Sequence, residues 1–184
     1  MYILASSSPR RKELLDKTNI EYKIVVKDIK EVFPERGGPG DKIKKVALDK
    51  AMAVFSDHPD DIVIGADTGV VICNDILGKP EDDIHAMEML MRLNANTHSV
   101  ITGVAIVSKY GVINFYEESK VTFKANKPEE IKKYVFTLEP RGKAGAYAIQ
   151  GDGKFLVESY TGDLDNIIGL PVARLLEELK KIGG

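Results

Sequence analysis

The residues with the clearest chemical potential lie directly behind the N-terminus, where Leu4 to Arg11 reads Leu-Ala-Ser-Ser-Ser-Pro-Arg-Arg. Proline has no N–H to leave unpaired at the first position of a helix, so Pro9 predicts a helix start with Ser8 as its N-cap. A helix start offers N–H donors and partial positive charge, and Arg10 and Arg11 add guanidinium groups that match phosphate oxygens. The segment therefore predicts a polyphosphate cradle. An ordinary helix start with a solvated arginine face explains it slightly better when it is taken alone.

A second candidate is Asp67, which lies in the polar stretch Gly65–Gly69 between two β-branched runs. A charged group in such a place loses hydration energy unless it is paired or binds a metal, so a chance placement is unfavourable. The alternative is an Asx-turn at the end of a strand, which the flanking glycines also favour. Lys79 follows in a Leu-Gly-Lys-Pro turn and predicts an ammonium near the same strand ends, although this signal is weak by itself.

A third candidate is the loop from Gly142 to Gly153, which is rich in glycine and alanine. Small residues let the backbone approach a ligand closely, while Lys143 offers a cation and Gln150 an amide that both donates and accepts hydrogen bonds. A loop packed tightly against a helix explains the same composition about equally well.

Composition narrows the function classes. The chain has 184 residues, 43% of them hydrophobic and 29% charged, with a net charge of −2, which predicts a folded protein without the basic field needed for stable nucleic-acid binding. Its one cysteine, Cys73, excludes an intrachain disulfide and a thiolate metal cluster, and it favours a reducing cytoplasm. No apolar run approaches the roughly 20 residues of a membrane span, and no export signal is recognisable.

Hydrophobic periodicity predicts the elements that must position these residues. Strands alternate with helices early and a long hairpin around Tyr110-Gly111 follows, which predicts an α/β fold with a mixed twisted sheet and flanking helices. Asp41 is the expected N-cap of the second helix, after the glycine-rich break at 37–40. Helices are predicted over 9–17, 41–55, 84–93, 127–136 and 171–179, and strands over 2–5, 22–26, 62–64, 70–72, 100–108, 112–123 and 155–159.

Taken together, the motifs resemble those of the Maf-like nucleotide pyrophosphatases, also called the septum-formation-inhibitor family. They occur in order from about residue 3 to residue 175, which is far more specific than any one of them. The matching segments are ASSSPRR at 5–11, GADT at 65–68, LGKP at 77–80, TGVA at 102–105, EP at 139–140, KAGAY at 143–147, IQG at 149–151 and GLP at 169–171.

The resemblance implies a single Maf/ITPase-like domain over residues 1–184, with two lobes around a central cleft. It implies hydrolysis of a nucleoside triphosphate to the monophosphate and pyrophosphate with Mg²⁺ or Mn²⁺, in a cytoplasmic homodimer. It places the catalytic carboxylate, usually assigned as the proton acceptor, at Asp67. It further places substrate-selecting residues at Arg11, Thr68 and Gln150, other triphosphate contacts at Ser8, Arg10, Lys50, Lys79 and Lys143, and metal ligands at Asp67 and Glu31.

Within that family, the Lys143–Tyr147 segment and Gln150 resemble the branch that acts on dTTP and UTP. The amide of Gln150 can read a pyrimidine edge with one donor and one acceptor. The implied role is house-cleaning, which includes removal of modified pyrimidine nucleotides, or cell-division arrest. The alternative function is a nucleotide-sensing regulator of septum formation without turnover.

The first prediction concerns Arg11. If this side chain selects the nucleotide, Arg11→Ala should lower the turnover of dTTP and UTP far more than it lowers folding stability. Pyrophosphate release and thermal unfolding, measured on the same preparation, test this expectation. The expectation is contradicted if Arg11→Ala lowers the unfolding temperature while its folded fraction turns over dTTP and UTP at the wild-type rate.

Overall fold

The computed structural model describes residues 1–182, and they fall into two compact units. Unit 1 contains Met1–Thr68, Thr102–Glu117 and the described chain from Leu164 onward. Unit 2 contains Gly69–Ile101 and Glu118–Asp163. The two lobes that the sequence predicts correspond to these two units.

Seven strands form one mixed sheet in the order β2-β1-β3-β5-β6-β7, with β4 paired to β3. Strand β1 is parallel to β2 and β3, whereas β4 is antiparallel to β3 and β7 is antiparallel to β6. The predicted α/β fold with a mixed sheet is confirmed, including the long hairpin of β5 and β6. The strands are β1 Tyr2–Leu4, β2 Tyr22–Ile24, β3 Ile62–Ile72, β4 Asp75–Leu77, β5 Thr97–Ser108, β6 Gly111–Phe123 and β7 Val157–Thr161.

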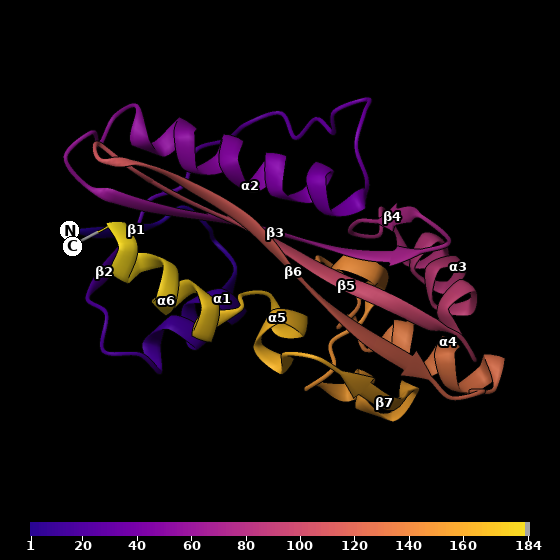
Figure 1. The fold of residues 1–184 in the computed structure, drawn as a ribbon. Coiled ribbons are helices and arrows are strands. Elements are labelled where there is room, and N and C mark those ends of the chain that lie inside the picture. Colours follow the sequence, from indigo (N-terminus) through magenta and orange to yellow (C-terminus); the bar gives the residue numbers. More distant parts are fainter. Residues whose placement is uncertain (183–184) are drawn as a thin grey trace. The chain divides into compact units, whose positions relative to one another are not determined.

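Unit 1 buries both faces of its part of the sheet. Helices α1 (Pro9–Asp16) and α6 (Val172–Ile182) cover one face, and helix α2 (Pro39–Phe55) covers the other (Figure 1). Successive strand residues point to opposite faces, so alternate positions of β1, β3 and β5 enter two separate cores. The α1/α6 core includes Leu4, Ile64, Ala66, Val104 and Ile106, and the α2 core includes Ile3, Ala5, Val63, Ala105 and Val107.

Unit 2 contains helices α3 (Asp83–Leu93) and α4 (Pro128–Phe136) and two short 3₁₀ turns, η1 (Ala144–Ala146) and η2 (Asp152–Leu156). The buried rings of His98, Phe123 and Tyr147 pack edge to face. The imidazole Nε2 of His98 lies 2.7 Å from the hydroxyl of Tyr147, and burial lowers the pKa of His98 to about 4. A neutral imidazole therefore anchors Tyr147, and with it the loop that contains Lys143.

The structure corrects several predicted boundaries. Strand β3 runs without a break through the polar stretch at Gly65–Gly69, and helix α2 packs directly over it at Gly65. Helix α2 starts at Pro39 with Gly38 as N-cap, and Asp41 lies in its first turn, where it pairs with Lys44. Pro39 is a stronger start signal than Asp41 because it fits the first helical position without losing a hydrogen bond.

Other differences lie near the C-terminus. Phe155 belongs to η2 and strand β7 begins only at Val157, while the last helix begins at Val172 and ends at Ile182. The short helix α5 (Leu164–Ile168) and strand β4 were not predicted, because polar residues, Asp75 in β4 and Asp165-Asn166 in α5, interrupt the apolar pattern that would identify an element.

Two glycines set the distance between α2 and the sheet. A Cβ atom on Gly65 of β3 would lie 2.4 Å from the carbonyl oxygen of Ala47, and one on Gly103 of β5 would lie 2.5 Å from the Cα of Lys44. Both contacts are with backbone atoms, which cannot rotate away. Glycine at these two positions therefore lets α2 lie directly on β3 and β5. The short distance between the helix and the sheet determines which strand residues the α2 side chains can reach.

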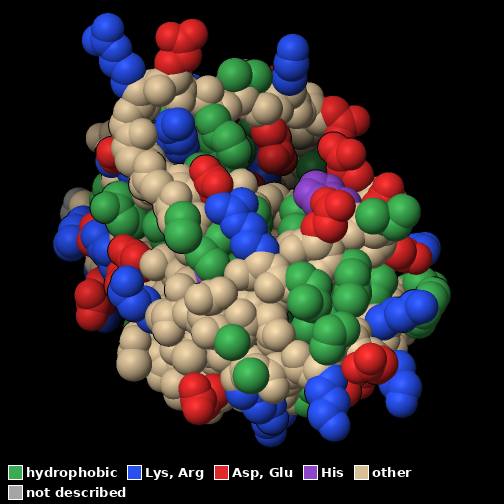
Figure 2. All heavy atoms as spheres, turned by 90° about the vertical axis from the view of Figure 1, so that its right-hand side faces the viewer, with side chains coloured by type: hydrophobic (Ala, Val, Ile, Leu, Met, Phe, Trp, Pro, Cys, Tyr) green, Lys and Arg blue, Asp and Glu red, His purple; other side chains and the backbone are tan. Residues whose placement is uncertain are grey.

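The surface is chemically mixed. On the face shown in Figure 2, Lys and Arg side chains lie beside Asp and Glu side chains. Within residues 1–182, no helix combines the length and the apolar character that a membrane crossing requires.

The second prediction tests the contact between α2 and β3. Gly65→Ala should lower the free energy of unfolding by about 1–3 kcal/mol, because the added methyl group forces α2 away from the strand. Chemical denaturation at neutral pH measures the change. Gly78→Ala is the matched control, because a Cβ at Gly78 meets nothing within 4 Å. It should shift stability by less than about 0.5 kcal/mol, and equal losses in the two variants would contradict the packing argument.

Candidate active site

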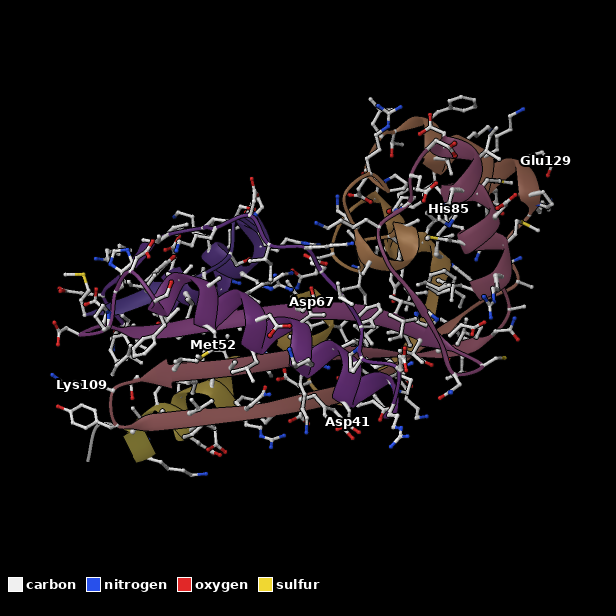
Figure 3. The ribbon with its side chains drawn as sticks, turned by 90° about the horizontal axis from the view of Figure 1, so that it is seen from above. Asp41, Met52, Asp67, His85, Lys109 and Glu129 are labelled. Carbon is white, nitrogen blue, oxygen red and sulfur yellow. The ribbon has the colours of Figure 1, made fainter. Side chains whose placement is uncertain are left out.

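One group of predicted site residues surrounds the ammonium of Lys50 in unit 1. Lys50 Nζ lies 2.7 Å from Asp67 Oδ1 and 2.8 Å from Glu31 Oε1. Figure 3 shows Asp67 on β3 beside helix α2, which carries Lys50. The side chains of Lys50 and Asp67 are only 19% and 15% exposed, whereas that of Glu31 is 54% exposed. The Asx-turn interpretation of Asp67 is wrong, because its carboxylate lies within a continuous strand and binds a lysine.

The same two carboxylates form the only oxygen pair among the predicted site residues that could receive a cation. Asp67 and Glu31 already converge on one positive charge, and carboxylate oxygens are the donors that Mg²⁺ prefers. No group of three or more His, Cys, Asp and Glu side chains that could hold a metal ion occurs among the described residues. A divalent cation at this place would therefore take its other ligands from water and from a bound phosphate, which is usual for Mg²⁺.

A second group in unit 1 surrounds the guanidinium of Arg11. Its Nε donates to the carbonyl of Gly169 at 2.8 Å, Nη1 donates to the hydroxyl of Ser6 at 3.0 Å, and Nη2 donates to the hydroxyl of Thr68 at 2.9 Å. The Thr68 hydroxyl also lies 2.9 Å from that of Thr102. Three of the five N–H donors of Arg11 thus hold the guanidinium in one orientation.

Arg11 stays charged at neutral pH despite its environment. Burial lowers the pKa of Arg11 to about 10, and the nearby charge of Arg10 acts in the same direction, while Asp67 and Glu31 act against it. A guanidinium that has lost hydration and is fixed by three hydrogen bonds is well placed to bind an acceptor on a ligand.

Strand alternation separates the two groups. Asp67 points to the α2 side of β3, as Val63 does, whereas Thr68 points to the α1/α6 side, as Ile64 and Ala66 do. Neighbouring residues of one strand therefore serve a carboxylate–ammonium group on one face and a guanidinium–hydroxyl group on the other.

Ser8 and Arg10 lie at the start of α1, as predicted. Ser8 is the N-cap residue and is half-buried, but its side chain makes no capping hydrogen bond. Its backbone N–H donates to Ser6 Oγ at 3.3 Å. The Ser8 hydroxyl is therefore not committed to capping the helix. Arg10 is half-buried beside it.

The remaining predicted site residues, Lys79, Lys143 and Gln150, belong to unit 2. The backbone N–H of Gly145 donates to the carbonyl of Gly78 at 3.0 Å, which joins the Lys79 turn to the loop that carries Lys143. Lys143 Nζ donates to the carbonyl of Glu139 at 2.6 Å. Lys79 and Gln150 are both exposed.

Glu139 and Tyr134 hold the backbone on both sides of Gln150. The N–H of Ala148 donates to the Tyr134 hydroxyl, which donates to Glu139 Oε2 at 2.6 Å. The N–H groups of Asp152 and Gly153 each donate to the Glu139 carboxylate at 2.9 Å. Burial raises the pKa of the Glu139 carboxyl, but the bonds from Tyr134 and these N–H groups outweigh it, so its pKa lies below the ordinary value.

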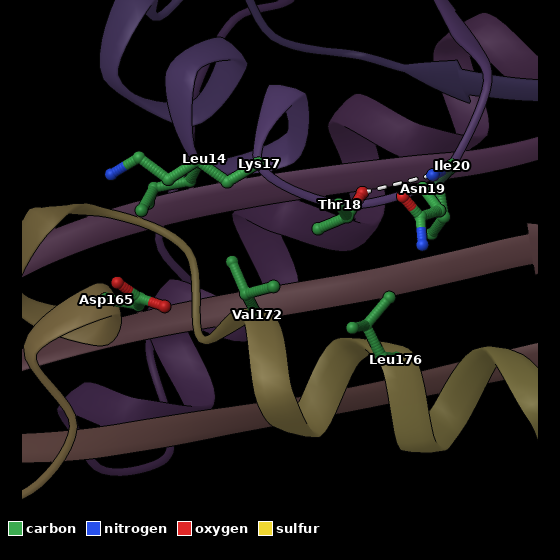
Figure 4. Close-up of a pocket in the computed structure, with 8 residues that line it drawn as sticks. All are labelled: Leu14, Lys17, Thr18, Asn19, Ile20, Asp165, Val172 and Leu176. Carbon is green, nitrogen blue, oxygen red and sulfur yellow. Dashed lines mark hydrogen bonds between the residues drawn. The ribbon is translucent and has the colours of Figure 1, made fainter.

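A cavity of about 550 Å³ lies elsewhere in unit 1, between the C-terminal end of α1 and helix α6. Leu14, Val172 and Leu176 provide its apolar wall, and Lys17 and Asp165 are charged residues at its margin (Figure 4). None of the eight residues that line it is a predicted site residue. The chemistry predicted from the sequence is therefore located outside this cavity.

Comparison with known proteins identifies the family. Residues 1–182 match the family described as "Maf-like protein". The chain belongs to the Maf-like protein family. This Maf-like protein is 47% identical over 180 residues to a protein of Bacillus cytotoxicus named dTTP/UTP pyrophosphatase. The alignment covers 98% of this chain and 94% of the relative. It is 48% identical over 179 residues to a protein of Bacillus cereus strain G9842 with the same name, at 97% and 94% coverage.

Solved structures agree on the fold of this Maf-like protein. The Staphylococcus aureus Ham1 protein aligns with a TM-score of 0.58 at 12% identity, over 98% of each chain. A HAM1 protein from Coxiella burnetii aligns with a TM-score of 0.51 at 12% identity, again over 98% of each chain. At this identity the likeness concerns the fold alone.

Sequence reasoning about this Maf-like protein assigned no role to several residues that support the site. Gly103, Glu139 and Gly169 lie in motifs that carried the resemblance, yet their contacts come from elements far away in the sequence. Gly169 has a φ of +140°, which favours glycine and directs its carbonyl at Arg11. Motif membership was the only signal that could have found them.

The third prediction concerns Glu139. Because its pKa is lower in the folded than in the unfolded chain, the carboxylate stabilises the fold above the unfolded value of about 4.3, and this stability is lost as the pH falls through the folded pKa. Glu139→Gln turns an amide NH₂ toward an N–H or O–H donor and should cost about 1–3 kcal/mol at pH 7. The difference from the wild type should shrink below about pH 4.

Urea unfolding at pH 7 and at acidic pH measures this difference. Glu129→Gln is the matched control, because Glu129 lies exposed in the first turn of α4, and it should change stability by about 0.5 kcal/mol or less. A Glu139→Gln loss that stays constant across this pH range would contradict the assignment.

Proposed function

We propose that this Maf-like protein hydrolyses dTTP and UTP to the monophosphate and pyrophosphate, as a cytoplasmic homodimer with a house-cleaning role. The observation that supports it most directly is the half-buried pair of Asp67 on β3 and Lys50 on α2, with the guanidinium of Arg11 held by Thr68 on the opposite face of the same strand. Relatives that are 47–48% identical along nearly the whole chain are named dTTP/UTP pyrophosphatase.

Asp67 acts as the general base. Its carboxylate takes a proton from the water that attacks the α-phosphorus, while the Lys50 ammonium holds Oδ1 at 2.7 Å and so fixes the orientation of the carboxylate. The Asp67 side chain is 15% exposed, so a water molecule can approach its carboxylate from only a few directions. This restriction favours a single orientation of the attacking water.

The carboxylates of Asp67 and Glu31 would hold a divalent cation, Mg²⁺ or Mn²⁺, because they already converge on one positive charge. When bound, such a cation neutralises charge on the triphosphate and activates water for attack. Glu31 is the more exposed of the two carboxylates and can change its partner from Lys50 at low cost.

The basic residues and the helix start bind the phosphates. Ser8 and Arg10 offer a hydroxyl and a guanidinium at the N-terminus of α1, where partial positive charge favours anions. Lys50, Lys79 and Lys143 supply ammonium groups that stabilise the departing pyrophosphate. Local charge of this kind suits a small anionic ligand on a protein whose net charge is −2.

Arg11, Thr68 and Gln150 select the base. Thymine and uracil share two carbonyl acceptors that flank an N3–H donor, so a site that accepts both must offer donors beside an acceptor. Arg11 and Thr68 form such a pair, with Nη2 and Oγ1 only 2.9 Å apart. The amide of Gln150 adds one donor and one acceptor.

The fourth prediction tests this function with a panel of nucleoside triphosphates in the presence of Mg²⁺ or Mn²⁺. The wild type should release pyrophosphate and monophosphate from dTTP and UTP faster than from dCTP, CTP, ATP, GTP and 7-methyl-GTP. Asp67→Asn keeps the side-chain shape but removes the base, and it should lower kcat by about 10²–10⁴-fold.

Asp49→Asn is the matched control, because Asp49 lies on the outer face of α2 and pairs with Lys45. We expect Asp49→Asn to leave turnover within about a factor of two of the wild type. An exposed ion pair contributes only ~0–1 kcal/mol to stability, so its loss should not disturb the fold. Near-normal turnover by Asp67→Asn with saturating metal would refute the role of Asp67. Tight nucleotide binding without pyrophosphate release by the wild type would instead favour the regulator.

A further inference from the structure

The hydroxyl of Thr102 is part of a short hydrogen-bonded chain that runs from Arg11 through Thr68 and Thr102 to the carbonyl of Asn166. Thr102 is fully buried, and its Oγ1 lies 3.0 Å from the carbonyl oxygen of Asn166 and 2.9 Å from Thr68 Oγ1. Thr68 Oγ1 in turn accepts from Arg11 Nη2 at 2.9 Å. All four residues belong to unit 1, and none of them but Arg11 and Thr68 has a role in the function proposed above.

The two ends of this chain fix the direction of every proton in it. A carbonyl oxygen only accepts, so the single hydroxyl proton of Thr102 points to Asn166. A guanidinium only donates, so the proton of Thr68 cannot point to Arg11. Thr68 therefore donates to Thr102, although the distance between the two hydroxyls alone leaves the direction open.

This direction decides what Thr68 offers to a ligand. A hydroxyl has one proton and two lone pairs, and in Thr68 the proton goes to Thr102 while one lone pair receives Arg11. One lone pair is left, so Thr68 presents an acceptor and no donor. Phosphate oxygens are acceptors too and would be repelled there. The ligand group that suits Thr68 is an N–H or O–H donor.

From this geometry we propose that Thr102 is a positioning residue for base selection, which fixes Thr68 as an acceptor for the N3–H of uracil and thymine. The inference rests on the proposed function, because it places the pyrimidine edge against Arg11 and Thr68. Cytosine carries an unprotonated N3, and its lone pair would face the lone pair of Thr68. A site with a buried, correctly paired acceptor rejects such an analogue strongly, because the polar group is left without a partner.

The test compares UTP with CTP in Thr102→Val, which keeps the shape of the side chain but removes the hydroxyl. Without Thr102 as acceptor, the Thr68 proton is free to turn toward a ligand, so Thr68 can donate to the N3 of cytosine. The ratio of kcat/KM for UTP over CTP should fall by roughly 10–100-fold. Thr102→Ser restores the hydroxyl and should keep the wild-type ratio within about twofold, a rescue that general loss of packing would not produce.

A double-mutant cycle separates positioning from structure. Thr68→Val removes the acceptor itself and should lower the ratio to a similar degree. If Thr102 acts through Thr68, adding Thr102→Val to Thr68→Val should leave the UTP over CTP ratio unchanged, whereas independent effects would multiply. An unchanged ratio in folded Thr102→Val, or a multiplied loss in the double variant, would overturn the proposal. Should Thr102→Val not fold, an unchanged ratio in Thr68→Val overturns it.

Equilibrium binding of UTP and CTP without added divalent cation provides the second readout. If the wild type binds UTP more tightly than CTP and Thr102→Val removes this preference, the inference stands even where no pyrophosphate is released and the proposed function fails. If the wild type releases pyrophosphate from UTP, but Thr102→Val changes neither the UTP over CTP ratio of binding nor that of kcat/KM, the proposed function stands and this inference fails.

Discussion

The close approach of helix α2 to strands β3 and β5 is the constraint on which the rest of unit 1 depends. It requires glycine at two positions, Gly65 and Gly103, where any side chain would collide with the helix backbone. The helix then brings Lys50 Nζ within 2.7 Å of Asp67 Oδ1. Gly65 lies two residues before Asp67, and Gly103 directly follows Thr102, whose hydroxyl contacts that of Thr68, so the same short strand segments serve packing and chemistry.

The carboxylate–ammonium group shows how this packing controls electrostatics. Asp67 lies in a strand that is buried on both faces, where an isolated carboxylate would lose several kcal/mol of hydration free energy. The charge is tolerated because Lys50 accompanies it and because Glu31, which is more exposed, shares the same ammonium. A site that already holds two carboxylates around one cation has little reorganisation to make when its charges are rearranged around a substrate.

The guanidinium–hydroxyl group on the other face follows a different principle. Its members are held by directional hydrogen bonds instead of ion pairs, and the direction is imposed by groups that can only donate or only accept. Unit 2 uses the same principle at Glu139, whose acceptor-only carboxylate gathers Tyr134 and two backbone N–H groups next to Gln150. In both units a residue outside the expected site fixes the geometry of a residue inside it.

The sequence by itself determined the family, the α/β class, most helices and the types of groups available for chemistry, because these depend on local patterns and on motif order. Pro9 and Pro128 start helices, and the alternation in β1, β3 and β5 sorts their side chains between two faces. Only the tertiary structure decided that β3 is continuous, that Lys50 holds Asp67 and Glu31, and that Thr102 and Gly169 reach the Arg11 group. The physical reason is that these contacts join residues 17 to 158 positions apart, and no local pattern encodes the distance and direction of such bonds.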